Sequence, residues 1–284
     1  MKKNGFTLIE LLSVIVILSV ISAIAYPKVL DVISSTKISA YNSAKGNIIQ
    51  SAKLKYLADV GSSIITEYNV DELIDEGYLK NTTKNPITNE KYENTKIIIT
   101  NEKGKITYDY IEGNTLFDVV SKKINKDGIY TVNNNYIYKG INAKNYVSFN
   151  EDIYRIIKID EFRNVYLLKS ENNELIKKDD IEKYINIYYN DNYSELLKKE
   201  ISSVDVLDYN DYLYTFENNN TFIQNNNDIW VKKDNNFTTL SYINNELVDS
   251  NTSTIRLVIK LNSNLVVLDG DGSNVSPYLI TKSN

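Results

Sequence analysis

The sequence of 284 residues contains no cysteine and no histidine. The absence of cysteine excludes disulfides, thiol nucleophiles and thiolate metal sites, so the folded parts must be stable without covalent cross-links. Because histidine is missing too, Ser–His and Cys–His nucleophilic sites are excluded. The chain also has no glycine-rich phosphate-binding loop. We therefore predict that the protein is not an enzyme and needs no cofactor.

Basic residues are not in excess either. The chain has 32 Lys and Arg against 37 Asp and Glu, a formal net charge of -5. Binding to nucleic acid without sequence preference requires clustered Lys and Arg, so we predict no nucleic-acid partner. The 23 tyrosines far outnumber the 7 phenylalanines. With the abundant Asn, Ile and Lys, this usage indicates a low-GC, Gram-positive-like bacterium as the source.

One long apolar run begins the chain. Residues 6–25 contain a single formal charge, that of Glu10, and as a helix they would extend about 30 Å, enough to cross the hydrocarbon core of a bilayer. Lys2 and Lys3 precede the run, which predicts a cytoplasmic N-terminus and an outward-facing C-terminal part. A carboxylate inside such a run costs about 2.5–3.5 kcal/mol on insertion scales. We therefore expect Glu10 to face a cation that the run itself does not supply.

The sequence GFTLIE at residues 5–10, followed by an apolar helix and Pro27, resembles the class III leader of type IV pilins and pseudopilins. The resemblance implies that a prepilin peptidase cleaves after Gly5, so that residues 1–5 are a leader peptide. It also implies that the new amine of Phe6 is methylated. The carboxylate of Glu10 would then meet the N-terminal amine of a neighbouring subunit during assembly.

The resemblance implies further partners and assembly residues. Thr7 and Pro27 are expected to take part in assembly along with Glu10. The implied partners are the prepilin peptidase and methylase, other pilin subunits, an inner-membrane platform protein and an assembly ATPase, with membrane lipid around residues 6–25. The protein would be a single-pass membrane protein with its N-terminus inside before assembly, and part of an extracellular filament at the cell surface afterwards.

Two other interpretations of the N-terminus remain open. A conventional secretory signal peptide is one, because residues 23–25 (Ala-Ile-Ala) have the small-residue pattern of its cleavage site. A plain membrane anchor in which Glu10 is incidental is the other. The length of the apolar run and its continuation into a helical pattern favour the pilin-type leader.

A helical pattern continues to about Asp59 and ends at Gly61, so we predict one helix over residues 6–60, kinked or loosened near Pro27. Residues 61–113 are predicted to form a small pilin-like head. Its parts are a short helix closed by Gly77 and a β-hairpin of residues 97–100 and 105–111.

The remaining residues, 114–284, predict a mostly β module with short helices. Strand patterns recur over residues 129–132, 136–139, 146–150, 153–160, 165–169, 254–261 and 265–268. Residues 179–201 have a helical pattern with a break at 190–192. Residues 146–160 and 270–279 resemble a module found in many surface proteins of low-GC Gram-positive bacteria, and no function follows from that resemblance. The overall fold class is therefore α+β.

Two features of this module are candidates for binding sites. Asp269 and Asp271 have the alternate spacing of calcium ligands, but the EF-hand pattern fails at Asn274 and Ile280. A tight turn explains the two Asp-Gly pairs better, so they are weak metal candidates only. Trp230 and the tyrosines would suit a sugar-stacking surface, although a core position is the more ordinary role.

The combined prediction is a type IV pilus-like subunit, minor or accessory because of its large C-terminal module. A pseudopilin of a type II secretion or DNA-uptake machine is a second possibility, since such proteins share the leader. A surface adhesin whose C-terminal module binds a glycan or protein is a third.

Overall fold

The computed structural model describes residues 8–59, 64–81, 83–102, 104–170, 174–223 and 227–282. Within the first helix it describes the backbone alone at residues 10, 20, 22–27, 30, 31 and 34. The chain divides into two compact units. Unit 1 comprises residues 1–61 and 68–93, and unit 2 comprises residues 62–67 and 94–284.

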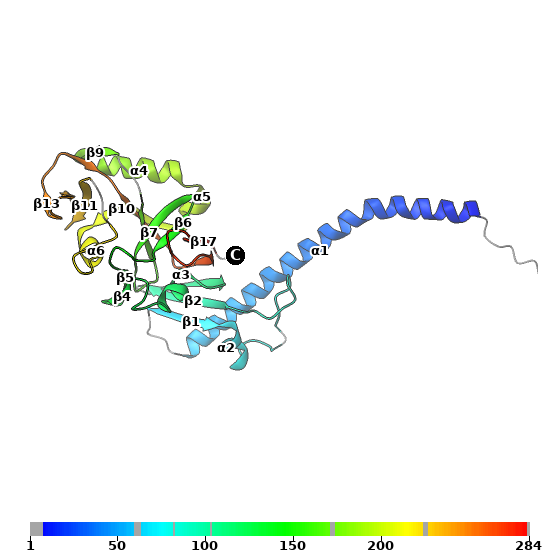
Figure 1. Ribbon diagram of the computed structural model, residues 1–284. Helices are drawn as coiled ribbons and strands as arrows, with labels where there is room; N and C mark the ends of the chain where they lie inside the picture. Colours follow the sequence, from blue (N-terminus) through cyan, green and yellow to red (C-terminus); the bar gives the residue numbers. More distant parts are fainter. Residues whose placement is uncertain are drawn as a thin grey trace, which may run out of the picture. The chain divides into compact units, whose positions relative to one another are not determined.

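Unit 1 is built on helix α1 (Leu8–Ala58), with the short helix α2 (Val70–Asp75) beside its C-terminal end (Figure 1). The C-terminal half of α1 buries apolar side chains at helical spacing, among them Ile48 and Ala52. Helix α2 ends where Gly77 adopts a φ of +81°, as the sequence predicts. No helix in the described part of the chain has a stretch that is long and apolar enough to span a bilayer.

Unit 2 contains the predicted hairpin, formed by β2 (Thr95–Glu102) and β3 (Lys105–Glu112) in a three-stranded sheet with β1 (Ile65–Asn69). The strands pair from Thr95↔Glu112 to Glu102↔Lys105, and Gly104 in the turn has a φ of +86°. Glycine suits this position because other residues are strained there. The hairpin prediction is confirmed.

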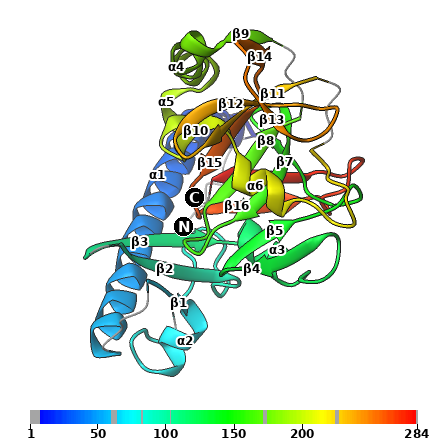
Figure 2. The same ribbon diagram turned by 90° about the vertical axis from the view of Figure 1, so that its left-hand side faces the viewer.

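A second, mixed sheet forms the body of unit 2. Its main path runs β13-β12-β11-β10-β15-β8-β7-β6-β17-β16, and β4, β5, β9 and β14 join it from the side. Figure 2 shows β7, β8, β15 and β10 side by side in its middle. The strands are β4 (Ile129–Val132), β5 (Asn135–Tyr138), β6 (Tyr146–Phe149), β7 (Asp152–Ile159), β8 (Val165–Lys169), β9 (Leu175–Lys177), β10 (Ile201–Asp208), β11 (Ile229–Lys233), β12 (Asn236–Leu240), β13 (Leu247–Val248), β14 (Thr252–Thr254), β15 (Leu257–Leu261), β16 (Leu265–Asp269) and β17 (Tyr278–Lys282).

Short helices connect these strands. They are α3 (Leu116–Ser121), the 3-10 helix η1 (Lys178–Asp180), α4 (Ile181–Asn192), α5 (Glu195–Lys198) and α6 (Tyr209–Tyr214). The predicted break in the helical pattern at residues 190–192 is wrong in position, because α4 continues through Asn192. The chain breaks instead at Tyr193, which is extended, and Ser194 caps α5 by accepting a hydrogen bond from the N–H of Leu197.

Pairs of Asn or Asp residues explain the tight hairpins of unit 2. Asn133 and Asn134 form the two-residue connection between β4 and β5, with φ values of +47° and +63°. Asp234 and Asn235 connect β11 and β12 in the same way, at +49° and +63°. Two successive left-handed residues are the requirement of the hairpin turn that matches strand twist, and Asn and Asp tolerate this conformation better than other residues with a side chain.

Apolar contacts in unit 2 also reach the hairpin. Ile98 of β2 and Ile111 of β3 pack with Val266 of β16, and the N–H of Val267 donates to the carbonyl of Asn114 at 2.9 Å. Residues 68–93 belong to unit 1 and the hairpin belongs to unit 2, and the head predicted over residues 61–113 stays a prediction. The boundary near residue 113 stays a prediction, and packed side chains cross it. The α+β class with a mostly β C-terminal part is confirmed.

A buried ion pair ties β2 to α3. The ammonium of Lys96 lies 2.6 Å from Asp118 and 3.1 Å from Glu67, and its side chain is 6% exposed. Asp118 also accepts from the N–H of Thr115 at 2.7 Å in a capping box. Although burial raises the pKa of Asp118, the hydrogen bond and charge of Lys96 outweigh it and hold that pKa below its usual value.

We predict that Asp118→Asn destabilises unit 2 at pH 7 by about 2 kcal/mol or more, because it leaves Lys96 buried with one carboxylate fewer. Because folding lowers the pKa of Asp118, its carboxylate stabilises the folded state at pH values above 3.8, its pKa in the unfolded chain, and this stabilisation is lost as the pH falls through the pKa of the folded state. The difference in the free energy of unfolding between wild type and variant should therefore become smaller below pH 4. Urea unfolding followed by the fluorescence of Trp230, the single tryptophan, measures it. Asp249→Asn, at a 97% exposed side chain, is the control, and an equal effect of both substitutions would contradict the prediction.

Candidate functional site

The N-terminal part of α1 exposes an apolar surface on all sides. Ten of its described side chains are between 45% and 85% exposed: Leu8, Ile9, Leu11, Leu12, Val14, Ile15, Val16, Ile17, Leu18 and Ile21. The hydroxyls of Ser13 and Ser19 donate to the carbonyls of Ile9 and Ile15, both at 2.7 Å. Because these hydroxyls bond to their own helix, they add little polar surface. A helix that is apolar all round requires lipid or partner helices to cover it.

The predicted processing residues Gly5, Phe6 and Thr7 lie outside the described residues. Glu10 and Pro27 lie on α1, whose helical backbone continues through both positions. In the sequence, Glu10 is the one charged residue of the apolar run. Figure 1 shows α1 curving along its length.

A cluster around Lys55 fastens α2 to the C-terminal end of α1. The Lys55 ammonium lies 2.6 Å from Glu76, 3.2 Å from Asp59 and 3.6 Å from Glu72. It also lies 4.9 Å from the ring centre of Tyr68, whose hydroxyl donates to Asp59 at 2.6 Å. The hydrogen bond to Glu76 is the largest cause that raises the pKa of Lys55. The cluster keeps unit 1 together at the point where α1 ends.

Residues 1–26 match the family model of the prokaryotic N-terminal methylation motif. The match includes Gly5, Phe6 and Glu10 and ends immediately before Pro27. No curated protein and no solved structure matches the chain. The comparison does not bear on the Gram-positive origin inferred from composition, which stays a prediction.

The motif supports a type IV pilin-like or pseudopilin precursor. Such a motif implies processing by a prepilin peptidase and assembly with other pilin subunits. It indicates a structural subunit that is anchored in a membrane as a precursor and then enters a surface filament. It covers the start of α1 only, so the remainder of the chain must be interpreted from its own geometry.

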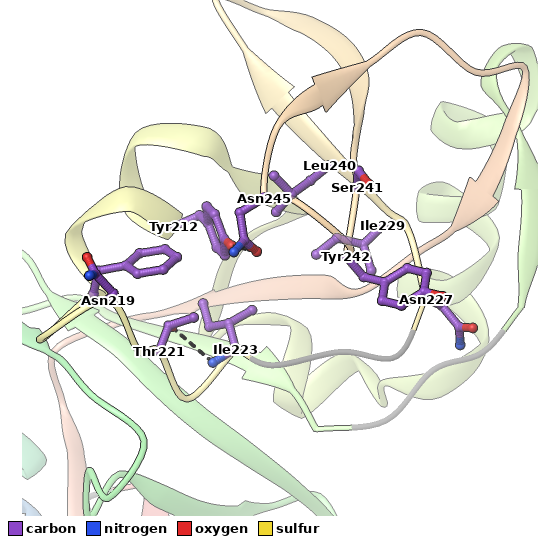
Figure 3. A pocket seen from close by; sticks show the side chains of 11 residues that line it. Tyr212, Asn219, Thr221, Ile223, Asn227, Ile229, Leu240, Ser241, Tyr242 and Asn245 are labelled. Atoms are coloured by element: carbon purple, nitrogen blue, oxygen red, sulfur yellow. Dashed lines mark hydrogen bonds between the residues drawn. The ribbon is translucent and has the colours of Figure 1, made fainter.

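One cavity of unit 2, of about 310 Å³, is lined by apolar and aromatic side chains and by three asparagines (Figure 3). Of this lining, Tyr212 and Ile229 are each 2% exposed, and Tyr242 is 51% exposed. The Tyr212 hydroxyl donates to the side-chain oxygen of Asn245 at 2.7 Å. None of the residues that line this cavity is charged. The chemistry of the lining therefore suits a neutral polar group.

A second cavity of unit 2, of about 550 Å³, differs in that two buried arginines, Arg155 and Arg256, line it. Neither residue is among the sites predicted from the sequence. Arg155 is the one charged residue in the buried stretch of β7, between Asp152 and Lys158, and an arginine in such a stretch is the signal that the sequence offers. Pairing between distant strands, which sequence patterns do not give, brings Arg256 to the same cavity.

The two weak metal candidates, Asp269 and Asp271, accept hydrogen bonds within the turn that contains them. The carboxylate of Asp269 accepts from the N–H of Gly270 at 2.7 Å, and that of Asp271 accepts from the N–H of Ser273 at 2.9 Å. The hydrogen bonds from Ser273 lower the pKa of Asp271. In the described part of the chain, no group of three or more acidic residues is placed to hold a metal ion.

Trp230 belongs to the core of unit 2. It is fully buried, and its indole N–H donates to the carbonyl of Ile176 at 2.9 Å. It therefore does not contribute to a sugar-stacking surface.

We predict that Gly270→Ala destabilises unit 2 far more than Gly104→Ala. Both glycines have a positive φ, +97° and +86°, which costs about 1–2 kcal/mol for alanine. A Cβ at Gly270 would also lie 2.1 Å from the carbonyl oxygen of Pro277, whereas one at Gly104 meets nothing within 4 Å. Thermal unfolding followed by Trp230 fluorescence should show a melting temperature lower by several degrees more for Gly270→Ala. Equal shifts would show that this turn is not held as tightly as described.

Proposed function

We propose that the protein is a minor or accessory subunit of a type IV pilus-like filament, cleaved after Gly5 and assembled through α1. The proposal rests on the methylation motif of residues 1–26. With cleavage after Gly5, Glu10 is the fifth residue of the mature chain. Cleavage creates a positive amine on Phe6, which is the cation that the apolar run lacks. In the filament, the carboxylate of Glu10 faces the amine of the next subunit.

The apolar surface of α1 supports the proposal that the subunit is assembled through this helix. Before assembly, residues 6–25 lie in the membrane, with Lys2 and Lys3 on the cytoplasmic side. The platform protein and the assembly ATPase then transfer the subunit into the filament, where neighbouring helices replace lipid around α1. A helix with this surface loses little on exchanging lipid for similar helices, so the charge pair sets the position of each subunit.

The size of unit 2 favours a minor or accessory position. Residues 94–284 form a folded body much larger than one hairpin and one helix. A bulky body limits how many copies can be placed along a filament. Unit 2 is therefore better suited to display at the surface than to the bulk of the filament.

Two other roles use the same leader. A pseudopilin of a type II secretion or DNA-uptake machine would be processed identically, and neighbouring genes for a secretion channel or a DNA receptor would identify it. An adhesin would use α1 only to display unit 2. The two cavities of unit 2 favour this role as the second candidate.

Substitution of Gly5 tests the processing step. Gly5→Leu should block cleavage, because a bulky side chain replaces the small residue at the cut, while Gly5→Ala should be cleaved in part. Intact-mass spectrometry of protein purified from cells should find wild type beginning at a methylated Phe6 and Gly5→Leu beginning at Met1. A wild-type chain beginning at Tyr26 would instead establish a secretory signal peptide.

Substitution of Glu10 tests the assembly contact. Glu10→Ala should enter the membrane as well as wild type or better, because the buried carboxylate is lost. Its incorporation into filaments should fall by about tenfold or more, because the amine of the neighbour loses its partner. Quantitative immunoblots of sheared filaments and of membranes measure the two fractions. Asp31→Ala, which removes an acid beyond the apolar run, is the matched control, and normal incorporation of Glu10→Ala would exclude the charge pair.

A further inference from the structure

The three arginines of the chain have different surroundings. Arg163 forms an ion pair with Glu67 at 2.5 Å. Arg155 and Arg256, which are 8% and 5% exposed, have no carboxylate within 4.0 Å among the described residues. A buried charge is normally paired, since an unpaired one has a large desolvation cost. Two such charges beside one cavity therefore require an explanation.

Neutral groups hold Arg155 in place. Its Nε donates to the side-chain oxygen of Asn145 at 2.5 Å, and its Nη2 donates to the carbonyl of Ala143 at 3.2 Å. The centre of the guanidinium lies 3.9 Å from the ring centre of Tyr146 and 4.8 Å from that of Phe222. These contacts fix the orientation of the guanidinium without cancelling its charge.

Arg256 is held in a similar way. Its Nε and Nη2 donate to the carbonyl of Lys169 at 3.2 and 3.1 Å, and Nη2 also donates to the carbonyl of Ser170 at 3.2 Å. In the described structure Nη1 of Arg256 has no acceptor. The hydroxyl of Ser170 is buried and likewise has no hydrogen-bond partner among the described residues. Donors without acceptors are thus available at this cavity.

The sheet register places these groups on one face. Arg155 of β7 pairs with Leu168 of β8, and Leu168 pairs with Val258 of β15. Arg256 and Ser170 lie two residues from Val258 and Leu168, and side chains two residues apart in a strand share a face. The two guanidiniums are also close enough to interact: burial, and then the charge of Arg155, lower the pKa of Arg256 to about 10. Both guanidiniums are positive at neutral pH.

The charged residues of the cavity leave a net charge of +2. Lys169 and Asp152, which also line it, form an ion pair at 3.0 Å and offset each other. The cavity measures about 550 Å³, which is within the usual range for small-molecule sites and much larger than an inorganic ion needs.

We propose that this cavity binds the oxyanion group of a small polar molecule, of the size of an acidic monosaccharide, between Arg155 and Arg256. A planar guanidinium matches the oxygens of a carboxylate, sulfate or phosphate. The hydroxyl of Ser170 supplies a further donor. The binding site lies within unit 2 and does not depend on cleavage after Gly5 or on filament assembly.

Isothermal titration calorimetry of the full chain in a non-ionic detergent tests the proposal. The probes are glucuronate for a carboxylate, glucose 6-phosphate for a phosphate, inorganic sulfate for the anion alone, and glucose as the neutral control. At least one of the two charged sugars should bind more tightly than sulfate, and glucose should give no binding. The stronger charged sugar identifies the oxyanion that the cavity prefers.

Three variants locate the binding. Arg256→Lys should weaken it at least tenfold, because lysine keeps the charge but loses the planar fork. Ser170→Ala should weaken it by about threefold to tenfold, the effect of losing one hydrogen bond. Arg163→Lys, at the arginine that already has a carboxylate, is the matched control and should bind as wild type does.

Several results would overturn the proposal. The first is that neither charged sugar binds at 10 mM, which would limit the binding free energy to about 2.7 kcal/mol. The second is that glucose binds as tightly as the charged sugars. The third is that Arg163→Lys loses as much binding as Arg256→Lys does. Unchanged binding in both Arg256→Lys and Ser170→Ala would also overturn it. If Arg256→Lys fails to fold by Trp230 fluorescence, Ser170→Ala decides alone, since it removes only an unpaired hydroxyl. Because the assay measures ligand binding by the isolated chain, a negative result leaves the filament proposal unaffected.

Discussion

The carboxylate of Glu10 stands alone in the apolar run that begins α1, and its need for a cation limits how the helix can be used. The described side chains around it are apolar and exposed, and the nearby serine hydroxyls bond to their own backbone. Such a helix can exchange lipid for similar helices at little cost, but it cannot leave a bare charge in either surrounding. The cleavage proposed after Gly5 would make an amine four residues before Glu10 and would so supply a partner of the right charge at the right end. The motif at residues 1–26 and the physical requirement therefore agree.

Unit 2 must be stable without disulfides, because the chain has no cysteine, and three features meet that need. Its sheet encloses one continuous core that includes Trp230 and strands from β4 to β17. Pairs of Asn or Asp residues in left-handed conformation make the hairpin turns short, which limits the chain entropy lost on folding. Buried ion pairs such as Lys96–Asp118 join elements that are distant in the sequence. Together they replace the covalent cross-links found in many secreted proteins of similar size.

Local elements could be predicted from the sequence because their signals are local. Strands bounded by Asn or Gly turns, the hairpin around Gly104 and the helix closed by Gly77 all appear near the expected residues. The pairing of these strands could not be predicted. Val266 joins the hairpin core, and β17 pairs in parallel with β6, through contacts that no short pattern specifies. The break predicted at residues 190–192 is wrong in position because α4 continues through its asparagines, and Ser194 supplies the cap that starts α5.

The same limit applies to the candidate sites. The leader is a linear motif, so Gly5, Phe6 and Glu10 could be selected from the sequence. The arginine cavity depends on the register of three strands, and composition alone pointed away from it because the chain is acidic overall.

Elsewhere in unit 2, buried cations are paired with carboxylates, and the arginine cavity differs in this respect. Several buried or partly buried lysines of unit 2 have carboxylate partners: Lys96 with Asp118 at 2.6 Å, Lys158 with Asp211 at 2.6 Å, and Lys260 with Asp160 at 3.5 Å. The fold therefore has acidic residues to place beside a buried cation. At Arg155 and Arg256 it places carbonyls, an amide and aromatic rings instead. These groups orient a guanidinium while leaving its charge uncompensated, which is the arrangement that a bound anion would complete.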